Sequence, residues 1–390
     1  MKSIVIIVII VVCVLAFSSC SIIRGLRTDG KGGPDIYSYK HRVVDTIAKG
    51  EQTQEIPVGK RADWIDTLPF FNQLPQCKDM TFADAIGDRN RNQGVMIIHD
   101  GSIVYEKYWG DFSADRMATI FSVSKSITSL LCGIAVDDGF IHSIDDPVTD
   151  YLPELKKKDP MWQKLTIRHL LDMRSGLDFD DTYEFTSLKD LKMINAMARL
   201  NYGHNIVKQI KGLKFRCEPG TEFRYESMTS AILGVVIERA SGRKYAEYLS
   251  EKVWKPLGME ADALINIDSR RHDMAHAFGG ITMTLRDLAK IGLLYLNNGM
   301  WEGRRIVSEE WIRHSSEYDA SNRGYHFNWY NLRYEGFPKA EYPGYYAFGI
   351  AAQVLYVNPH KNLVMVRMGT SNNSDAYIPE LFEQLSNNWR

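Results

Sequence analysis

The sequence predicts an α+β fold, in which strands from both chain ends form one antiparallel sheet flanked by helices and a mainly helical subdomain is inserted between them. Apolar runs of strand length lie near both ends of the chain, whereas the middle repeats apolar residues at spacings of three and four, which is typical of helices. The chain has 390 residues, of which 45% are hydrophobic and 24% charged, so it has the composition of a folded protein.

The strand signals come in pairs separated by turns. Residues 95–98 and 103–105 flank Asp100 and Gly101, a pair that favours a two-residue hairpin turn. Near the C-terminus, residues 353–357 and 363–368 flank the turn-like stretch 358–362, and a helix is predicted for residues 377–387.

Helices are predicted between these two ends, over residues 126–137, 167–173, 187–200, 230–240 and 285–296. We therefore expect one folded domain over residues 76–390, with its sheet part in 76–120 and 280–390 and its helical part in 121–279.

The N-terminus is predicted to be an export signal. Lys2 precedes the apolar residues 4–17, and two serines lead to Cys20. This pattern resembles a bacterial lipoprotein signal of residues 1–19, after which Cys20 would be lipidated and tether the domain outside the cytoplasm. Phe17 stands where such signals usually have leucine, and an uncleaved signal anchor is the alternative. Residues 20–75 are predicted to be a tether and an irregular lead-in, because they are polar and glycine-rich.

Charge and cysteine content exclude two further classes. The chain has 47 basic residues (Lys and Arg) and 48 acidic ones (Asp and Glu), so its net charge is 47 − 48 = −1. It therefore lacks the positive electrostatic field that nucleic-acid binding requires. Five cysteines are too few for a disulfide scaffold. Cys132 is expected to be a small core residue, and whether Cys77 pairs with Cys217 is left open.

The strongest chemical motif is Ser122 followed three residues later by Lys125, where a loop enters an apolar helix. Positions i and i+3 share one helix face, so a partly buried Lys125 amine could take the proton of the Ser122 hydroxyl and make it a nucleophile. A second serine-x-x-lysine match, Ser241 to Lys244, lies where a helix is predicted to end, and we interpret it as a C-cap with solvated charges.

Two further elements complete the pattern. Tyr225 and Ser227 precede the helix of residues 230–240, and Tyr225 could pass a proton to a leaving group if the Lys125 charge lowers its pKa. Gly349 lies in a stretch leading into the strand at residue 353, where glycine allows a substrate close to the backbone.

These elements, in this order, resemble the serine β-lactamase and D,D-peptidase fold, and most of all the class C β-lactamase-related hydrolases of the 6-aminohexanoate-dimer hydrolase group. The resemblance covers roughly residues 80–390. It implies a β-lactamase/transpeptidase-like fold, with Ser122 as the acylated nucleophile, Lys125 as its base and Tyr225 as a proton shuttle.

The resemblance also implies the substrate-binding groups. The backbone N–H of Ser122, with one near Gly349 and Ile350, would form the oxyanion hole. Ser227 stands where many members have asparagine, and Tyr183 would face the substrate. No metal and no organic cofactor are implied, and the expected partners are small ester, amide or peptide-like substrates.

One departure bears on the substrate. The strand motif that carries a cation in penicillin-recognising members has Ala347 at that position. A substrate carboxylate would lose a charge-assisted hydrogen bond of ~1.5–3 kcal/mol there. We therefore expect esters or amides to be preferred and β-lactamase activity to be weak or absent.

Three alternatives stay open. The chain could be a D,D-peptidase or β-lactamase, or a non-catalytic domain of this fold that binds peptidoglycan or β-lactams. It could also be a zinc hydrolase, because His272 and His276 are spaced to share one helix face.

Overall fold

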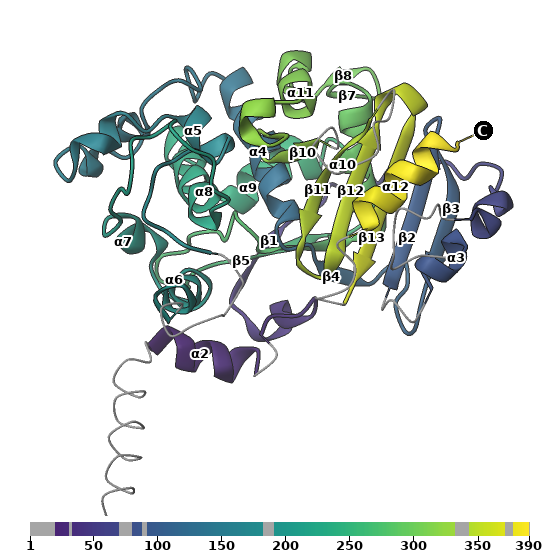
Figure 1. Cartoon of the computed structure of the whole chain (residues 1–390), viewed down its shortest axis with the longest axis horizontal. Coiled ribbons are helices and arrows are strands. Elements are labelled where there is room, and N and C mark those ends of the chain that lie inside the picture. Colours follow the sequence, from purple (N-terminus) through teal and green to yellow (C-terminus); the bar gives the residue numbers. More distant parts are fainter. Residues whose placement is uncertain are drawn as a thin grey trace, which may run out of the picture.

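A computed structural model describes residues 20–30, 33–69, 80–87, 92–181, 191–331, 343–370 and 377–389. Its main element is a seven-stranded antiparallel sheet that joins the two ends of the chain, as predicted (Figure 1). The strands follow the order β3 (Ser102–Tyr108), β2 (Asn92–His99), β13 (Leu363–Gly369), β12 (Gln353–Asn358), β11 (Tyr345–Gly349), β10 (Trp329–Asn331) and β9 (Tyr325–His326).

The predicted hairpins are confirmed. β2 and β3 pair antiparallel with His99 opposite Ser102, and the turn between them has Asp100 at φ 47° and Gly101 at φ 74°. Two successive positive φ angles match the right-handed twist of the strands, which explains why an Asp-Gly pair lies at this turn. The C-terminal strands β12 and β13 pair antiparallel as well.

Helices cover both faces of the sheet (Figure 1). Helix α12 (Ile378–Asn387) packs on the face that presents Val95, Ile97 and Met365. Helix α10 (Leu285–Leu296) packs on the opposite face, which presents the alternate residues of the same strands, such as Met96 and Val364. The period of two along each strand thus separates two apolar cores.

The helical part lies beside the sheet and is built around two buried helices, α4 (Val123–Asp137) and α8 (Ser227–Ser241). The predicted helices are all found, α10 with the predicted ends and the others with shifted ends, although residues 187–190 lie outside the described part. The other helices are α3 (Phe82–Ala85), α5 (Ile167–Leu171), α6 (Leu191–Tyr202), α7 (Ile206–Ile210), α9 (Tyr245–Leu249) and α11 (Glu309–Ser316). α8 ends in a left-handed C-cap at Gly242, as the sequence indicates for the second serine-x-x-lysine match.

The described part of the predicted lead-in, residues 20–30 and 33–69, is partly regular, because it contains a helix and a strand that the sequence pattern does not predict. β1 (Val44–Ile47) is an edge strand of a second sheet, ordered β1, β5 (Ala263–Asn266), β6 (Ile281–Thr284) and β4 (Met117–Thr119), and a third sheet pairs β7 (Met300–Trp301) with β8 (Arg304–Arg305). Ile36, Ile47 and Ile65 are fully buried. Single buried isoleucines therefore pack the lead-in against the core, and they are spaced too widely along the sequence to show a helical or strand period.

Helix α2 (Cys20–Thr28) packs against α6 rather than extending as a free tether (Figure 1). Arg24 donates a hydrogen bond to the Tyr202 carbonyl. Among the described residues, no helix has the length and apolar character required to traverse a bilayer. The predicted signal, residues 1–19, lies outside the described residues.

Two cysteines can be placed. Cys132 is a buried free thiol on α4, as predicted, and Cys217 is half-buried and forms no disulfide with another described residue. Cys77 lies outside the described residues, so its pairing with Cys217 stays open.

Candidate active site

The structure brings Ser122 and Lys125 together. Ser122 is the N-cap residue of α4, but its hydroxyl accepts no capping hydrogen bond from the helix. Lys125 Nζ lies 2.9 Å from Ser122 Oγ and donates a second hydrogen bond, of 2.7 Å, to the Phe278 carbonyl. The serine oxygen is thus directed at the amine instead of at its own helix, which is the geometry of a nucleophile and its base.

A strained turn places Ser122 at the helix start. The chain turns sharply from β4 into α4, and Phe121 between them has φ 45°, a left-handed conformation that costs a non-glycine residue about 1–3 kcal/mol. Phe121 is buried, and its carbonyl accepts the Ser124 N–H. Within the described residues the N–H of Ser122 has no hydrogen-bond partner, so it is free to bind an oxyanion.

Burial changes the acidity of Lys125. Its side chain is 1% exposed, and burial lowers the pKa of the amine to about 7 while the Asp181 carboxylate opposes that shift. Removing an ammonium from water favours the neutral amine. A substantial fraction of Lys125 is therefore neutral near pH 7 and able to accept a proton.

Tyr225 completes the predicted triad. Its hydroxyl is hydrogen-bonded to the Ser122 side chain, and Lys125 Nζ lies 5.1 Å from the centre of its ring. Burial and the neighbouring Tyr330 and Tyr325 raise the pKa of Tyr225 well above its usual value. The sequence analysis made proton transfer by Tyr225 conditional on a lowered pKa, and that condition is not met, because burial disfavours the phenolate. Tyr225 is thus a neutral proton donor, not a phenolate.

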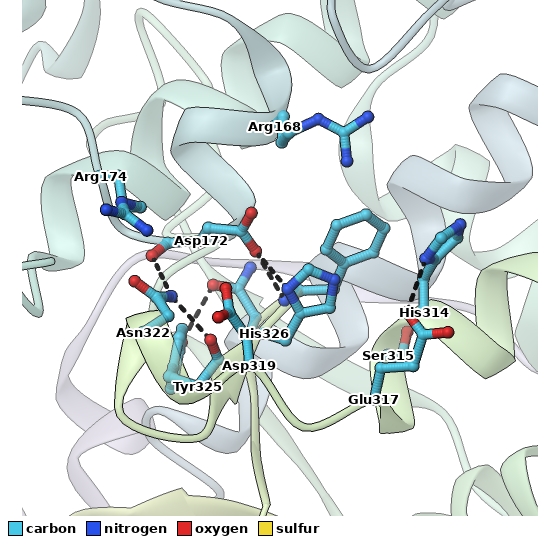
Figure 2. Close-up of polar contacts among 12 residues, drawn as sticks. Arg168, Asp172, Arg174, His314, Ser315, Glu317, Asp319, Asn322, Tyr325 and His326 are labelled. Carbon is cyan, nitrogen blue, oxygen red and sulfur yellow. Dashed lines mark hydrogen bonds and ion pairs between the residues drawn. The ribbon is translucent and has the colours of Figure 1, made fainter. Parts of the chain in front are cut away.

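An aromatic cluster holds the Tyr225 ring. Tyr325 meets it edge-on at 6.0 Å between ring centres, and Tyr330 stacks on it at 6.5 Å. Tyr325 is anchored in turn, because Asn322 donates hydrogen bonds both to the Tyr325 carbonyl and to the Asp172 carbonyl (Figure 2). The orientation of Tyr225 therefore depends on β9 and β10 as well as on its own segment.

Asp181 is a site residue that sequence reasoning missed. It is 2% exposed and accepts the backbone N–H of Ser227 at 2.6 Å and the Ser227 hydroxyl. Burial raises the pKa of Asp181, whereas Ser227 and Lys125 lower it. The Asp181 carboxylate lies at the start of α8, where its negative charge limits how far burial lowers the Lys125 pKa. Tyr183, the predicted substrate-facing residue, lies outside the described residues.

Strand β11 approaches the nucleophile closely. A methyl group added to Gly349 would lie 2.5 Å from the Ile120 carbonyl oxygen and 3.1 Å from Ser122 N, so only glycine fits there. Gly349 was expected to lead into the strand at residue 353, but it ends a separate strand, β11, and pairs with Gln353 across a tight corner. Ile350, the first residue of that corner, lines the cavity beside Ser122.

A cavity of about 300 Å³ opens at Ser122. Ser122, Lys125, Ser227 and Ile350 line it together, so residues far apart in the sequence meet at one place. The N-terminal segment contributes a further wall through Arg42 and its neighbours. No sequence pattern indicates that wall, since the apolar residues of the segment follow no helical or strand period.

The two predicted zinc ligands do not share a helix face. His272 lies in a turn and contacts the His204 carbonyl at 2.7 Å, whereas His276 lies in a buried loop and stacks on Phe278. Burial lowers the pKa of His276 to about 3, so the ring is neutral.

Another group of possible metal ligands lies on the α11 side of the molecule. His314, Glu317 and His326 have ligand atoms within 4.8 Å of one another (Figure 2). His326 Nδ1 also lies 3.1 Å from an Asp172 oxygen. Arg313 forms an ion pair with Glu317, so a cation already occupies the surroundings of this group, and we assign it no part in the chemistry at Ser122.

Residues 82–384 match the family model described as Beta-lactamase. The chain is 30% identical over 220 residues to a 6-aminohexanoate-dimer hydrolase of Paenarthrobacter ureafaciens, with 56% of this chain and 55% of that protein covered. It is 28% identical over 214 residues to a D-aminopeptidase of Brucella anthropi, with 52% and 38% covered. The chain thus spans about half the length, or less, of these curated relatives.

Comparison with solved structures shows the fold. A structure from Bacillus anthracis assigned as a 6-aminohexanoate-dimer hydrolase superposes with a TM-score of 0.76 at 18% identity and covers 94% of both chains. A class C beta-lactamase superposes with a TM-score of 0.57 at 17% identity, over 78% of this chain and 94% of that one. The predicted β-lactamase/transpeptidase-like fold is confirmed.

Proposed function

This chain belongs to the beta-lactamase family, and on that premise we propose that it is a serine hydrolase that cleaves an ester or amide through an acyl-enzyme on Ser122. The observation that carries the proposal is the buried Lys125 amine, 2.9 Å from Ser122 Oγ and with a pKa of about 7. A serine with a neutral amine at hydrogen-bond distance can lose its proton as it attacks a carbonyl carbon.

The proton balance follows from the three side chains. Ser122 Oγ bonds to the substrate carbonyl carbon and gives its proton to the Lys125 amine. Tyr225, neutral and hydrogen-bonded to Ser122, donates a proton to the leaving alcohol or amine and is reprotonated by Lys125. Water then attacks the acyl-serine, its proton returns through the same groups, and Ser122 is restored.

The oxyanion that forms in each step needs hydrogen-bond donors. We assign the free N–H of Ser122 and the N–H of Ile350, at the end of β11, to this task. Removing one such donor typically lowers kcat by about 10²–10³-fold.

The proposed substrates are esters or amides, with little β-lactamase activity. Ala347 on β11 is buried and carries no charge, so that strand offers no cation to a β-lactam carboxylate. The D-aminopeptidase relative keeps peptide-like amides among the candidates. A D,D-peptidase or β-lactamase, or a binding domain that retains the fold without turnover, is the second candidate.

A panel of p-nitrophenyl esters, short p-nitroanilides and nitrocefin tests the proposal on the wild type, Ser122→Ala and Ser241→Ala. Ser241 belongs to the other serine-x-x-lysine match and serves as the control, because its hydroxyl bonds only backbone groups at the end of α8, donating to the Ile237 carbonyl and accepting the Arg243 N–H. We expect ester and amide turnover to fall at least 10³-fold in Ser122→Ala and to persist in Ser241→Ala. Equal rates in the wild type and Ser122→Ala reject an enzyme acting through Ser122, and strong nitrocefin turnover that depends on Ser122 overturns the substrate preference.

We also propose that the protein is an extracytoplasmic lipoprotein anchored through Cys20. The support is the sequence pattern of a short positive start, an apolar run and a cysteine after two serines. Mass spectrometry of the purified N-terminus should find a diacyl or triacyl Cys20 as the first residue. An intact Met1, or an unmodified Cys20, would contradict the lipid anchor.

A further inference from the structure

An arginine from the N-terminal segment reaches the substrate cavity. Arg42 lies two residues before Val44, which pairs with Asn266 across β1 and β5, and both Arg42 and Asn266 line the cavity that opens at Ser122. Among the described residues that line this cavity, the charged ones are Arg42 and Lys125. Both are basic, and no carboxylate is among these lining residues, although Asp29 pairs with Arg42 from behind.

Arg42 is held in place by groups that leave part of its guanidinium unused. One terminal nitrogen pairs with the Asp29 carboxylate, and the plane lies 4.8 Å from the centre of the Tyr202 ring. The side chain is only 9% exposed, yet its Nε–H has no hydrogen-bond partner among the described residues. A buried, unpaired guanidinium donor costs stability, so its retention points to a ligand that pairs with it.

Asn266 presents the complementary unmet group. It is 4% exposed, and its side-chain oxygen has no hydrogen-bond partner in the described part of the chain. The site thus offers an unpaired guanidinium N–H just before β1 and an unpaired amide oxygen on β5. A ligand with a carboxylate and an N–H group would satisfy both at once.

We propose that Arg42 and Asn266 form an anion subsite of the cavity, so that the preferred substrates are amides that carry a carboxylate. This inference rests on the proposed hydrolase function and deepens it. The subsite lies on the β1–β5 wall, not at position 347 of β11, so it supplies a cation to the substrate from a different element.

Asp29 is the positioning residue of this subsite. Its carboxylate accepts the Tyr202 hydroxyl at 2.5 Å as well as the Arg42 guanidinium, so it links helix α6 to the arginine. The Arg42–Asp29 ion pair fixes the orientation of the guanidinium. Because the guanidinium is planar and already oriented, it loses little conformational entropy when a carboxylate binds. A lysine at position 42 would keep the charge but not this geometry.

The test compares matched substrates that differ in one charge. One pair is the mono-p-nitroanilide of hexanedioic acid and its terminal carboxamide. The other pair places the charge on the leaving amine, as N-acyl derivatives of 5-amino-2-nitrobenzoate and 5-amino-2-nitrobenzamide. The enzymes are the wild type, Arg42→Gln, Arg42→Lys and Arg304→Gln, where Arg304 is an exposed residue of β8 and serves as the matched control.

For at least one pair, we expect wild-type kcat/KM to favour the carboxylate by about 10-fold or more, mainly through KM, since only the carboxylate can accept a charge-assisted hydrogen bond from Arg42. The preference should fall to about 1 in Arg42→Gln, recover in part in Arg42→Lys and persist in Arg304→Gln. It should also shrink as salt is added.

Three results would overturn the subsite. One is a wild-type ratio near 1 for both pairs, a result that holds even if the Arg42 variants do not fold. A second is an undiminished ratio in a folded Arg42→Gln variant, checked by circular dichroism. The third is a preference for a phosphonate analogue over the carboxylate, which would assign the site to another anion.

Failure of the hydrolase itself looks different. In that case neither member of a pair is hydrolysed, and a fluorophosphonate probe leaves Ser122 unlabelled. If the subsite alone is wrong, both members are hydrolysed and Ser122 is labelled, but the ratio does not depend on Arg42.

Discussion

At the scale of single residues, the chemistry depends on how burial shifts three neighbouring groups. Lys125 is pushed toward its neutral form, Tyr225 is kept neutral, and the buried Asp181 favours the charge on Lys125. The serine-x-x-lysine spacing predicted that Ser122 and Lys125 lie close together, because positions i and i+3 share one helix face. The spacing could not predict the raised pKa of Tyr225, which depends on burial and on the neighbouring tyrosines of β9 and β10.

The pH dependence follows from the Lys125 pKa. Only the neutral amine can accept the Ser122 proton, so kcat/KM should rise as pH increases through about 7 and reach a plateau above about 8. Stopped-flow or steady-state ester hydrolysis between pH 5 and 9.5 measures it. A flat profile, or a rate that falls over this range, would show that Lys125 is not the base.

Asp181→Asn should move that profile. The Asp181 charge raises the Lys125 pKa, so its removal should shift the acid limb of the profile to lower pH. Asparagine keeps an oxygen for the Ser227 N–H, so a purely structural role would lower the rate without moving the limb. Asp180→Asn, at the more exposed neighbouring position, is the control and should leave the limb in place.

Asp181 and Asn266 show what a linear motif misses. Asp181 contacts Ser227, 46 positions away, and Asn266 reaches the cavity only through the pairing of β5 with β1. Neither residue has a fixed sequence spacing from Ser122 that a motif could specify, so only the three-dimensional structure reveals them.

At the scale of elements, the close approach of β11 to the start of α4 builds the site. Local periodicity predicted α4, α10 and the two hairpins well, because each depends on near neighbours. It did not separate β11 from β12, since the corner at residues 350–352 is short and apolar and contains no glycine or proline. The nearest turn residue, Gly349, is required by packing against the chain at residue 120.

Gly349→Ala tests that approach. Its methyl would overlap the Ile120 carbonyl oxygen and press on Ser122 N, so β11 must move away from the oxyanion donors. We expect kcat to fall about 100-fold and stability by about 1–3 kcal/mol. Gly50→Ala, where an added methyl has ordinary contacts of 3.5 Å or more, is the control. An active Gly349→Ala enzyme would remove β11 from the oxyanion hole.

At the scale of the whole molecule, the N-terminal segment is part of the catalytic domain and not a spacer. It adds β1 to a sheet, and residues 57–59 run beside β3. It also supplies Arg42 to the cavity. Sequence reasoning described this segment as a lead-in because its buried residues are single isoleucines between polar stretches, a pattern without a helical or strand period.

Ile47→Ala tests the integration of this segment. Ile47 is fully buried on β1, and its truncation should lower the free energy of unfolding by about 2–4 kcal/mol, measured by urea denaturation. Val58→Ala, at a residue that is 77% exposed, should change it by less than about 0.5 kcal/mol. Equal, small effects of the two variants would return the segment to the role of a tether.

The most direct test of the proposed mechanism is the mass of the acyl-enzyme. The protein is mixed with a p-nitrophenyl ester, quenched in acid within milliseconds to seconds, digested and analysed by mass spectrometry. We predict one acyl group per chain, on the peptide that contains Ser122, and its loss in Ser122→Ala. Turnover without a covalent adduct, or an adduct on another residue, would contradict the mechanism.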